Sequence, residues 1–298
     1  MGDDATATRD RRVEVRKMYK LFINGTFVRS ESARSTPLWD GRAFLANIAQ
    51  ASRKDLRDAV TAARTAQSRW WAQDPQLRGL MLYRLGEMLE ARRPEYLALL
   101  SEGTGGNARA AREEIDTAID RVVWYAGWCD KYSALLSSRN PVSGPHFNCS
   151  TPEPIGVVGI LAPQSPLFLG IISAMLPPLV AGNATVVLAS ERDPRPASAL
   201  AEAIALSDIP PGVVNVLTGF RSEIAPAMAK HDGIEAISCS REDLAQWEEI
   251  ERESAASIKR IRPFEVESAG DYFSERAQSL DGIAEFCEIK TIWHPVGF

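Results

Sequence analysis

The chain has 298 residues, 45% of them hydrophobic and 24% charged, which is ordinary for a globular protein and excludes collagen-like, coiled-coil and wholly disordered chains. At about 150 residues per domain, this length predicts two domains or one large domain. The 34 basic and 39 acidic side chains give a net charge of −5, so the basic balance expected of a nucleic-acid-binding protein is missing.

The cysteines and histidines do not indicate a metal site or a disulfide framework. The 4 cysteines form no CxxC pair and the 3 histidines are far apart in the sequence, which fits a reducing compartment. Residues 1–17 are charged and lack an apolar core, so we expect a disordered tail and not a signal peptide. The apolar stretch 167–182 is interrupted by two prolines and is shorter than the ~20 residues of a membrane span. We therefore expect a cytoplasmic protein with no membrane or nucleic-acid partner.

Residues 18–136 begin with a hairpin pattern and continue as amphipathic helices. Asn24-Gly25 stands between two short apolar runs, which is typical of a β-hairpin turn. Apolar periodicity then predicts three helices: one capped by Ser52, one from about Pro75 with a break at 92–94, and one over 109–136.

The middle of the chain predicts a doubly wound α/β domain. Four apolar runs, at 155–162, 184–189, 213–217 and 234–238, alternate with helix-length segments. Such alternation indicates a parallel, Rossmann-type sheet whose strands are buried on both faces. Residues 137–154 before it read either as a linker or as a short exposed strand in which Phe147 and Cys149 alternate with polar neighbours.

The last part of the chain has a different pattern. Residues 241–259 predict a charged helix, and residues 262–280 have no clear pattern. Residues 285–293 alternate in polarity, as a strand does.

No familiar catalytic signature is present. The sequence contains no GxGxxG, GxxxxGK[ST], GxSxG or HExxH motif. Cys239 follows a predicted strand, where a nucleophile can sit, but a lone cysteine is more often a small buried hydrophobic residue. The residues alone therefore predict an α/β domain with a helical N-terminal part and no defined reaction.

Several stretches resemble the NAD(P)-dependent aldehyde dehydrogenases. These stretches are YKLFINGTFV at 19–28, the helical segment 59–105, the segment from EPIGVVGILAP at 153 to PPGVVNVLTG at 219, and GIAEFCEIKTIW at 282–293. Together they cover roughly residues 18–240 and 280–293. The resemblance implies that family's cofactor-type domain and a small β oligomerisation element.

The chain departs from this family at the positions expected to bind the cofactor. Ser165 stands where the resemblance implies an asparagine, and Ala189 where it implies a lysine that contacts the adenosine ribose. Glu191 matches a family glutamate. Cys239 and Leu244 replace glycines, and a Cβ there blocks the close approach of a phosphate. We therefore expect no bound cofactor, with NAD binding as the alternative.

The resemblance also implies a second α/β domain that carries the catalytic cysteine, for which this sequence leaves little room. Roughly 50 residues separate position 240 from the terminal strand, too few for a domain. We expect 241–284 to be a linker that replaces the catalytic domain. Neither Cys239 nor Cys287 lies in the family's catalytic motif, so we assign no catalytic residue and no metal ligand.

These features predict six segments: a tail (1–17), the hairpin and helices (18–136), an oligomerisation hairpin (137–154), the Rossmann-type sheet (155–240), a linker (241–284) and a terminal oligomerisation strand (285–298).

In the family the resemblance points to, the hairpin and the terminal strand form a sheet that is added to a neighbouring subunit. The residues that we expect at such a partner interface are Phe147, Cys149, Ile289, Thr291 and Trp293. We expect the partner to be a full-length, active aldehyde dehydrogenase and the assembly to be a hetero-oligomer. The hypothesis is a non-catalytic, pseudoenzyme-like subunit that stabilises or regulates that partner. The alternatives are an NAD(P)-binding subunit that contributes to aldehyde oxidation within the complex, and a decayed fragment without a role.

Overall fold

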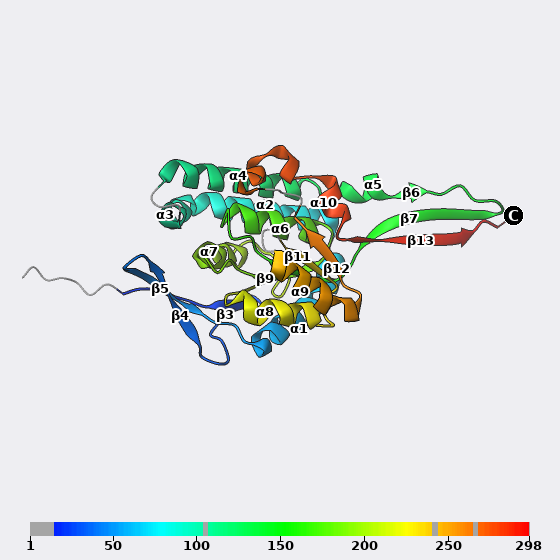
Figure 1. The fold of residues 1–298 in the computed structure, drawn as a ribbon. Coiled ribbons are helices and arrows are strands. Elements are labelled where there is room, and N and C mark those ends of the chain that lie inside the picture. The colour runs from blue at the N-terminus through cyan, green and yellow to red at the C-terminus, as the bar shows by residue number, and fades with distance from the viewer. Residues whose placement is uncertain (1–14, 104–106, 240–243, 265–267, 298) are drawn as a thin grey trace, which may run out of the picture.

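The computed structural model describes residues 15–103, 107–239, 244–264 and 268–297, which are built around a central sheet (Figure 1). The strand order is β12-β11-β8-β9-β10-β2-β3. In chain order the strands are β2 (Leu21–Ile23), β3 (Thr26–Val28), β8 (Val157–Leu161), β9 (Ala184–Leu188), β10 (Val214–Leu217), β11 (Ala236–Cys239) and β12 (Arg260–Pro263). The strands from β12 to β10 are parallel, and β2 and β3 continue the sheet in antiparallel pairs.

Helices cover both faces of this sheet (Figure 1). One face carries α2 (Pro75–Ala91), α3 (Arg93–Gly103), α4 (Ala108–Ala126), α6 (Leu169–Val180) and α7 (Arg195–Ile204). The other carries α1 (Arg53–Trp71), α8 (Arg221–Lys230) and α9 (Leu244–Ser254). Every residue of β8 and β9 is buried, because a parallel strand between two helical layers has no solvent face.

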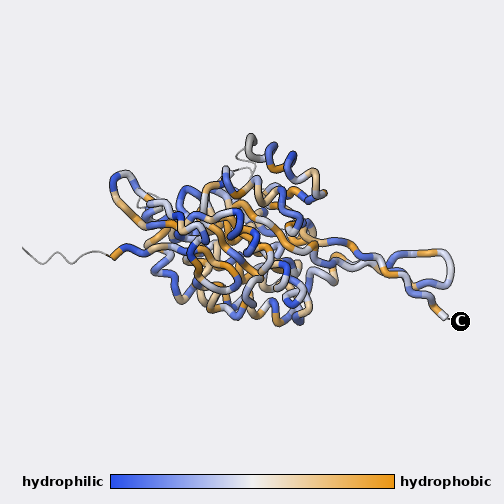
Figure 2. The backbone as a smooth tube through the Cα atoms, turned by 90° about the horizontal axis from the view of Figure 1, so that it is seen from below, coloured by the Kyte–Doolittle hydropathy of each residue, from blue (hydrophilic) through white to orange (hydrophobic). Residues whose placement is uncertain are grey.

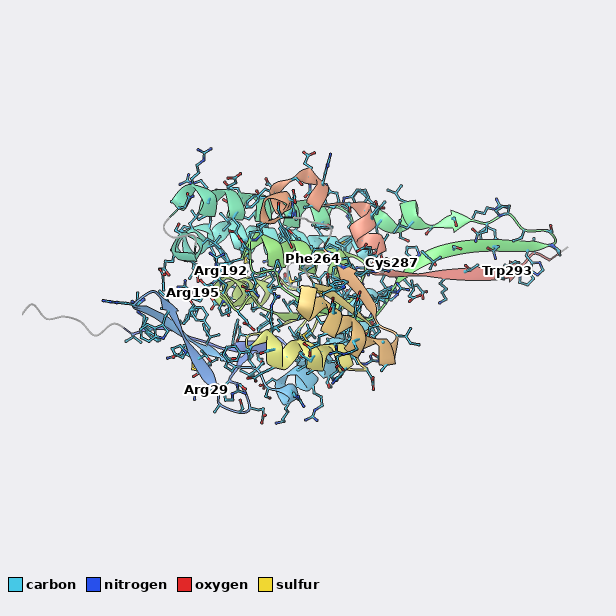
Figure 3. The ribbon with its side chains drawn as sticks, in the orientation of Figure 1. Arg29, Arg192, Arg195, Phe264, Cys287 and Trp293 are labelled. Carbon is cyan, nitrogen blue, oxygen red and sulfur yellow. The ribbon has the colours of Figure 1, made fainter. Side chains whose placement is uncertain are left out.

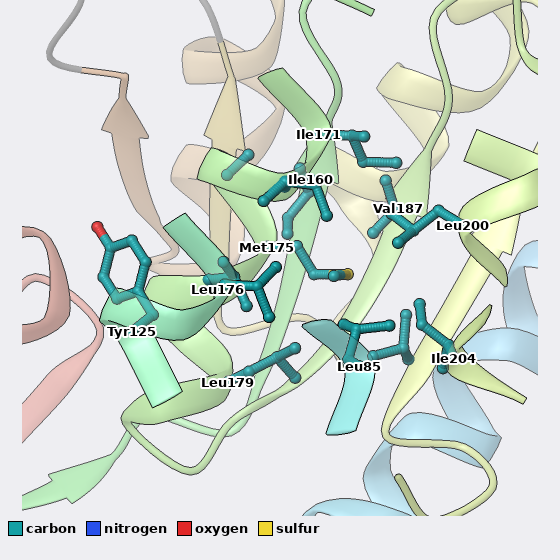
Figure 4. Close-up of a cluster of buried hydrophobic side chains, with 14 of the residues drawn as sticks. Leu85, Tyr125, Ile160, Ile171, Met175, Leu176, Leu179, Val187, Leu200 and Ile204 are labelled. Carbon is teal, nitrogen blue, oxygen red and sulfur yellow. The ribbon is translucent and has the colours of Figure 1, made fainter. Parts of the chain in front are cut away.

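The apolar cluster between the sheet and the first helical layer shows why the strands read as unbroken apolar runs. Ile160 and Val187 extend from the sheet to meet Met175 of α6 and Leu200 of α7 (Figure 4). All four side chains are fully buried. The predicted fold class, an α/β Rossmann-type sheet with N-terminal helices, is confirmed.

Local signals in the N-terminal part also hold. Asn24 and Gly25 have φ angles of 51° and 74° and join β2 to β3. Ser52 caps α1, and its side chain and that of Asp55 accept each other's backbone N–H. A second, small sheet is formed by β1 (Met18–Tyr19), β5 (Ala43–Ala49) and β4 (Ser35–Asp40). The sequence pattern predicts no strand for β4 or β5.

The helix predicted over 109–136 is interrupted. α4 ends at Ala126, and a short helix α5 (Tyr132–Leu136) follows after a turn.

Within 137–154, residues 138–139 and 146–154 form strands, so Phe147 and Cys149 lie in a strand and not in a linker. β6 (Ser138–Arg139), β7 (His146–Pro154) and β13 (Cys287–Pro295) make a three-stranded antiparallel sheet in the order β13-β7-β6. This sheet, called the arm below, projects from the body (Figure 1), and its backbone alternates between polar and apolar residues (Figure 2).

The stretch expected to be a linker, 241–284, contains regular structure in its described part. Besides α9 and β12 it forms η1 (Ala255–Ser257), η2 (Ala269–Phe273), η3 (Glu275–Ala277) and α10 (Leu280–Ala284). β12 is a correction to the sequence analysis, which found no strand there. Its Arg-Ile-Arg-Pro sequence lacks an apolar run because β12 lies at the border of the sheet, where none of its residues is fully buried.

The side chain of Asn183 fastens the root of the arm to the body. Its Oδ1 accepts a hydrogen bond from the Gly156 N–H at 2.8 Å. Its Nδ2 donates to the carbonyl oxygens of Pro178 at 3.1 Å and Phe286 at 3.0 Å. Asn183 is completely buried, so all three segments rely on one carboxamide and not on water.

Replacing Asn183 tests this connection. Asn183→Ala removes three buried hydrogen bonds, and we expect the free energy of unfolding to fall by about 2–4 kcal/mol. Gln67→Ala is the control, because its amide makes one bond nearby, to the Gly182 carbonyl at 3.1 Å, and we expect it to cost about 1 kcal/mol. Urea denaturation monitored by tryptophan fluorescence measures both. Equal losses for the two variants would contradict the assigned role.

Candidate functional site

The parallel sheet has a topological switch point between β8 and β11. From β8 the chain runs through α6 to its neighbour β9, whereas from β10 it runs through α8, on the opposite face, to β11. Open α/β sheets bind ligands outside the carboxyl ends of the strands at such a point. Ser165, Ala189, Glu191 and Cys239 all lie at or just beyond these carboxyl ends. Leu244 begins α9, but its side chain lies outside the described residues.

Ala189 and Cys239 are core residues. Ala189 is 1% exposed, and its N–H donates to the Leu217 carbonyl at 2.9 Å. Cys239 is 2% exposed and packs in the apolar cluster beneath α1 and α8. A lysine in place of Ala189 would place a charge in the core, and the Cys239 side chain fills the space that a glycine would leave open.

Gln164 joins the loops that follow β8 and β9. Its Oε1 accepts hydrogen bonds from the Ser190 hydroxyl at 2.7 Å and from the Arg192 N–H at 3.2 Å. The neighbouring Ser165 is half-buried. The side-chain amide of Gln164 therefore links the two loops at this part of the edge.

Arg221, the first residue of α8, closes the edge further. Its guanidinium Nη2 donates to the Ala162 carbonyl at the end of β8, so the side chain passes over the end of β9. Its backbone N–H donates to the Glu191 carboxylate. Arg221 was not identified from the sequence as a residue of this edge. Its position, at the start of a helix that follows a predicted strand, could have indicated that it lies there.

These contacts test whether the edge suits the dinucleotide that the resemblance implies. Glu191 already accepts a hydrogen bond from within the chain, and the Arg221 guanidinium crosses the edge at the strand ends. Cys239 has a side chain at a position where the resemblance implies a glycine beneath a pyrophosphate. The described residues of this edge therefore fit a dinucleotide poorly.

The N-terminus of α6 is occupied by a side chain of the same protein, that of Glu114. Such a terminus attracts anions, because its N–H groups lack partners and the helix dipole is positive there. Glu114 of α4 is 5% exposed, and its Oε1 accepts from the N–H groups of Phe168 at 2.6 Å and Leu169 at 3.1 Å. Burial raises the pKa of Glu114 above its ordinary value, and the two N–H groups offset part of that rise.

Three of the 4 cysteines are buried, and Cys149 is partly exposed. Burial raises the pKa of Cys129 and of Cys287 to about 12, so both are protonated thiols at neutral pH. Cys239 is buried in the core, and Cys149 lies on the arm. Over the described ranges there is no cluster of histidine, cysteine and carboxylate groups suited to a metal, and no helix long and apolar enough for a membrane crossing.

The five residues expected at a partner interface all lie on the arm, but on two different faces. β7 and β13 pair from Cys287 opposite Pro154 to Pro295 opposite His146. In this register Ile289, Thr291 and Trp293 share one face, and Phe147 and Cys149 lie on the other. Ile289 and Trp293 are 58% and 60% exposed, and Figure 3 shows Trp293 near the tip of the arm and Cys287 at its root.

The pH dependence of stability tests the buried Glu114. Because its pKa in the folded protein lies above the ordinary 4.5, the folded state binds more protons than the unfolded state above pH 4.5. The free energy of unfolding of the wild type should therefore decrease, relative to that of Glu114→Gln, as the pH rises above 4.5. Denaturant titrations of both proteins across this range measure the difference. A constant or growing advantage of the wild type with rising pH contradicts the assignment.

Comparisons with known proteins agree on one family. The model of the aldehyde dehydrogenase family matches residues 30–271. Retinal dehydrogenase 2 of Homo sapiens is 32% identical over 229 residues, which cover 74% of this chain and 43% of that relative. Omega-crystallin of Nototodarus sloanii is 30% identical over 227 residues, covering 74% and 45%.

Solved structures give the same result. The NAD+ complex of an aldehyde dehydrogenase from Bacillus cereus superposes with a TM-score of 0.77 and 27% identity, over 82% of this chain and 50% of that one. HpcC from Thermus thermophilus superposes with the same TM-score of 0.77 and 27% identity, over 83% and 48%. The chain thus spans about half the length of the relatives that it matches. The extent of the family match and the shared fold show that this chain belongs to the aldehyde dehydrogenase family.

Proposed function

We propose that this chain is a non-catalytic aldehyde dehydrogenase-like subunit that assembles in the cytoplasm with a full-length, active aldehyde dehydrogenase and stabilises or regulates it. The observation that carries the proposal is the arm. β13 lies at its border and, within the described residues, pairs on one side only. An unpaired strand edge beside exposed apolar side chains is a template for strand addition by another chain.

The absence of a catalytic role is inferred from what lies between β12 and β13. Within the described residues the chain there contains η2, η3 and the short helix α10, and no further sheet. Oxidation of an aldehyde through a covalent intermediate needs a positioned thiolate. The raised pKa values of Cys129 and Cys287 and the core position of Cys239 argue against each of these thiols.

The two faces of the arm suit different tasks. The face with Ile289 and Trp293 carries a Ser150–Thr291 hydroxyl pair at 3.0 Å, so it is fixed across the strands and still exposes two large apolar groups. The opposite face exposes Phe147 and Ile292 less, to 40% and 42%, and carries the Lys290–Glu153 ion pair at 2.9 Å. We infer that the face with Ile289 and Trp293, called the apolar face below, packs on the partner and that the outer edge of β13 supplies main-chain hydrogen bonds.

Charged substitutions on the apolar face test the assembly. The wild type, co-expressed with a full-length aldehyde dehydrogenase from the same cell, should elute as a complex of fixed stoichiometry, measured by native mass spectrometry. Ile289→Lys combined with Trp293→Lys should lower the amount of complex at least about tenfold, because two buried apolar contacts become charged. Ile258→Lys is the control, since Ile258 is 92% exposed and lies outside the arm. A wild-type chain that stays monomeric beside every such enzyme would sink the proposal.

The alternative function, an NAD(P)-binding subunit that contributes to aldehyde oxidation within the complex, is favoured by Glu191. This carboxylate is exposed and lies beside a hollow between the β4–β5 hairpin and the edge of the central sheet.

Calorimetry with NAD and NADP separates the two functions. We expect no saturable heat from the wild type, because Arg221 and Cys239 fill the edge, and recovery of binding in Arg221→Gly combined with Cys239→Gly. The rescue omits Ala189→Lys, which would bury a charge in the core. Tight binding by the unmodified chain would favour the alternative function.

A further inference from the structure

A separate cavity lies on the α6 face of the sheet, between α4, α6, the ends of β11 and β12, and the segment from η2 to α10. Its volume is about 70 Å³, which suits a ligand of a few non-hydrogen atoms. Ala174, Pro177 and Phe286 contribute apolar wall, and the hydroxyls of Ser173 and Ser238 contribute polar wall. Apolar walls with a few convergent polar groups are typical of small-molecule sites.

A buried guanidinium stands directly behind this wall. Arg121 of α4 is 2% exposed. Its Nη1 donates to the Ser173 hydroxyl at 2.6 Å and its Nη2 to the Ser274 carbonyl at 3.2 Å, and both acceptors are neutral. Its Nε is buried and has no hydrogen-bond partner. A buried charge without a counter-charge is costly, and burial lowers the pKa of Arg121 from its ordinary value.

Two more arginines lie close to the cavity, one of them on its wall. Arg262 of β12 is the register partner of Ser238, so it lies on the face of the sheet that forms the wall, and its Nε is buried without a partner. Arg276 of η3 lines the cavity directly. Over the described residues none of the three arginines is ion-paired. Glu285 also contributes a carboxylate to the described wall, and it has an interaction within the chain.

We propose that this cavity binds a small organic carboxylate, whose oxygens meet the Arg276 guanidinium and the Ser173 hydroxyl that Arg121 holds from behind, and whose alkyl body lies against Ala174, Pro177 and Phe286. Guanidinium groups match the planar carboxylate with paired, charge-assisted hydrogen bonds. The apolar part of the wall favours a carboxylate with a hydrocarbon body over inorganic phosphate, which has none. This site is argued from the cavity alone and does not rest on the assembly proposed above.

Propionate is the probe, and calorimetry on the full-length chain measures its binding. Propionamide, which has the same shape without the charge, is the neutral control, and inorganic phosphate is the competing oxyanion. Arg276→Gln is the principal variant, because Arg276 is exposed and its loss leaves the core intact. Arg121→Gln tests the buried cation, and its fold is checked by circular dichroism. Arg57→Gln is the matched control, an exposed arginine on α1.

Propionate should bind, propionamide should not, and Arg276→Gln and Arg121→Gln should each weaken binding by about tenfold or more, as expected for the loss of a charge-assisted hydrogen bond. Arg57→Gln should leave the affinity unchanged. The proposal is overturned if propionate gives no saturable heat, if Arg276→Gln binds as well as the wild type, or if phosphate binds more tightly than propionate. If Arg121→Gln does not fold, the result for Arg276→Gln alone still tests the proposal.

Discussion

The connection between the arm and the body depends on one buried carboxamide, that of Asn183. Its hydrogen bonds connect the start of β8, the end of α6 and the residue that precedes β13. The body is a sheet between two helical layers, and it is complete without the arm. The arm has two long strands and no second layer, so its direction is set at its root. Arg260 supports this root, because its guanidinium donates to the Cys287 carbonyl at 2.9 Å and pairs with Glu288 at 2.6 Å.

At the carboxyl edge of the sheet, polar groups are satisfied by side chains of the same chain. Gln164, Glu114 and Arg221 each take a polar group that such an edge would present to a ligand, and each belongs to a different element. The replacements are locally favourable, because every one satisfies a hydrogen bond that would otherwise need water. The same sheet retains its parallel order, and the superposition on NAD-bound aldehyde dehydrogenase structures remains close, with a TM-score of 0.77. The fold is shared with the family, whereas a ligand site has to be argued from the side chains at this edge.

Strands such as β8 and β9 were predictable because burial on both faces requires an unbroken apolar run, and that run is visible in the sequence. β12 was not, because a border strand is only partly buried and its Arg-Ile-Arg-Pro sequence forms no apolar run. The placement of the candidate residues was predictable, because the strand ends bring Ser165, Ala189, Glu191 and Cys239 to one edge. Glu114 and Arg221 act on groups 54 and 59 positions away, and no local pattern records such distances.

The pairing of β7 with β13 also has a consequence for how the protein reaches its native state. Ser150 and Thr291 face each other although 141 positions separate them. Contacts between segments so distant along the chain form slowly, because a large loop must close before the pairing stabilises it. One edge of β7 therefore stays unpaired while the ribosome synthesises the helices and strands between β7 and β13. We expect this interval to be the period in which the nascent polypeptide depends most on chaperones.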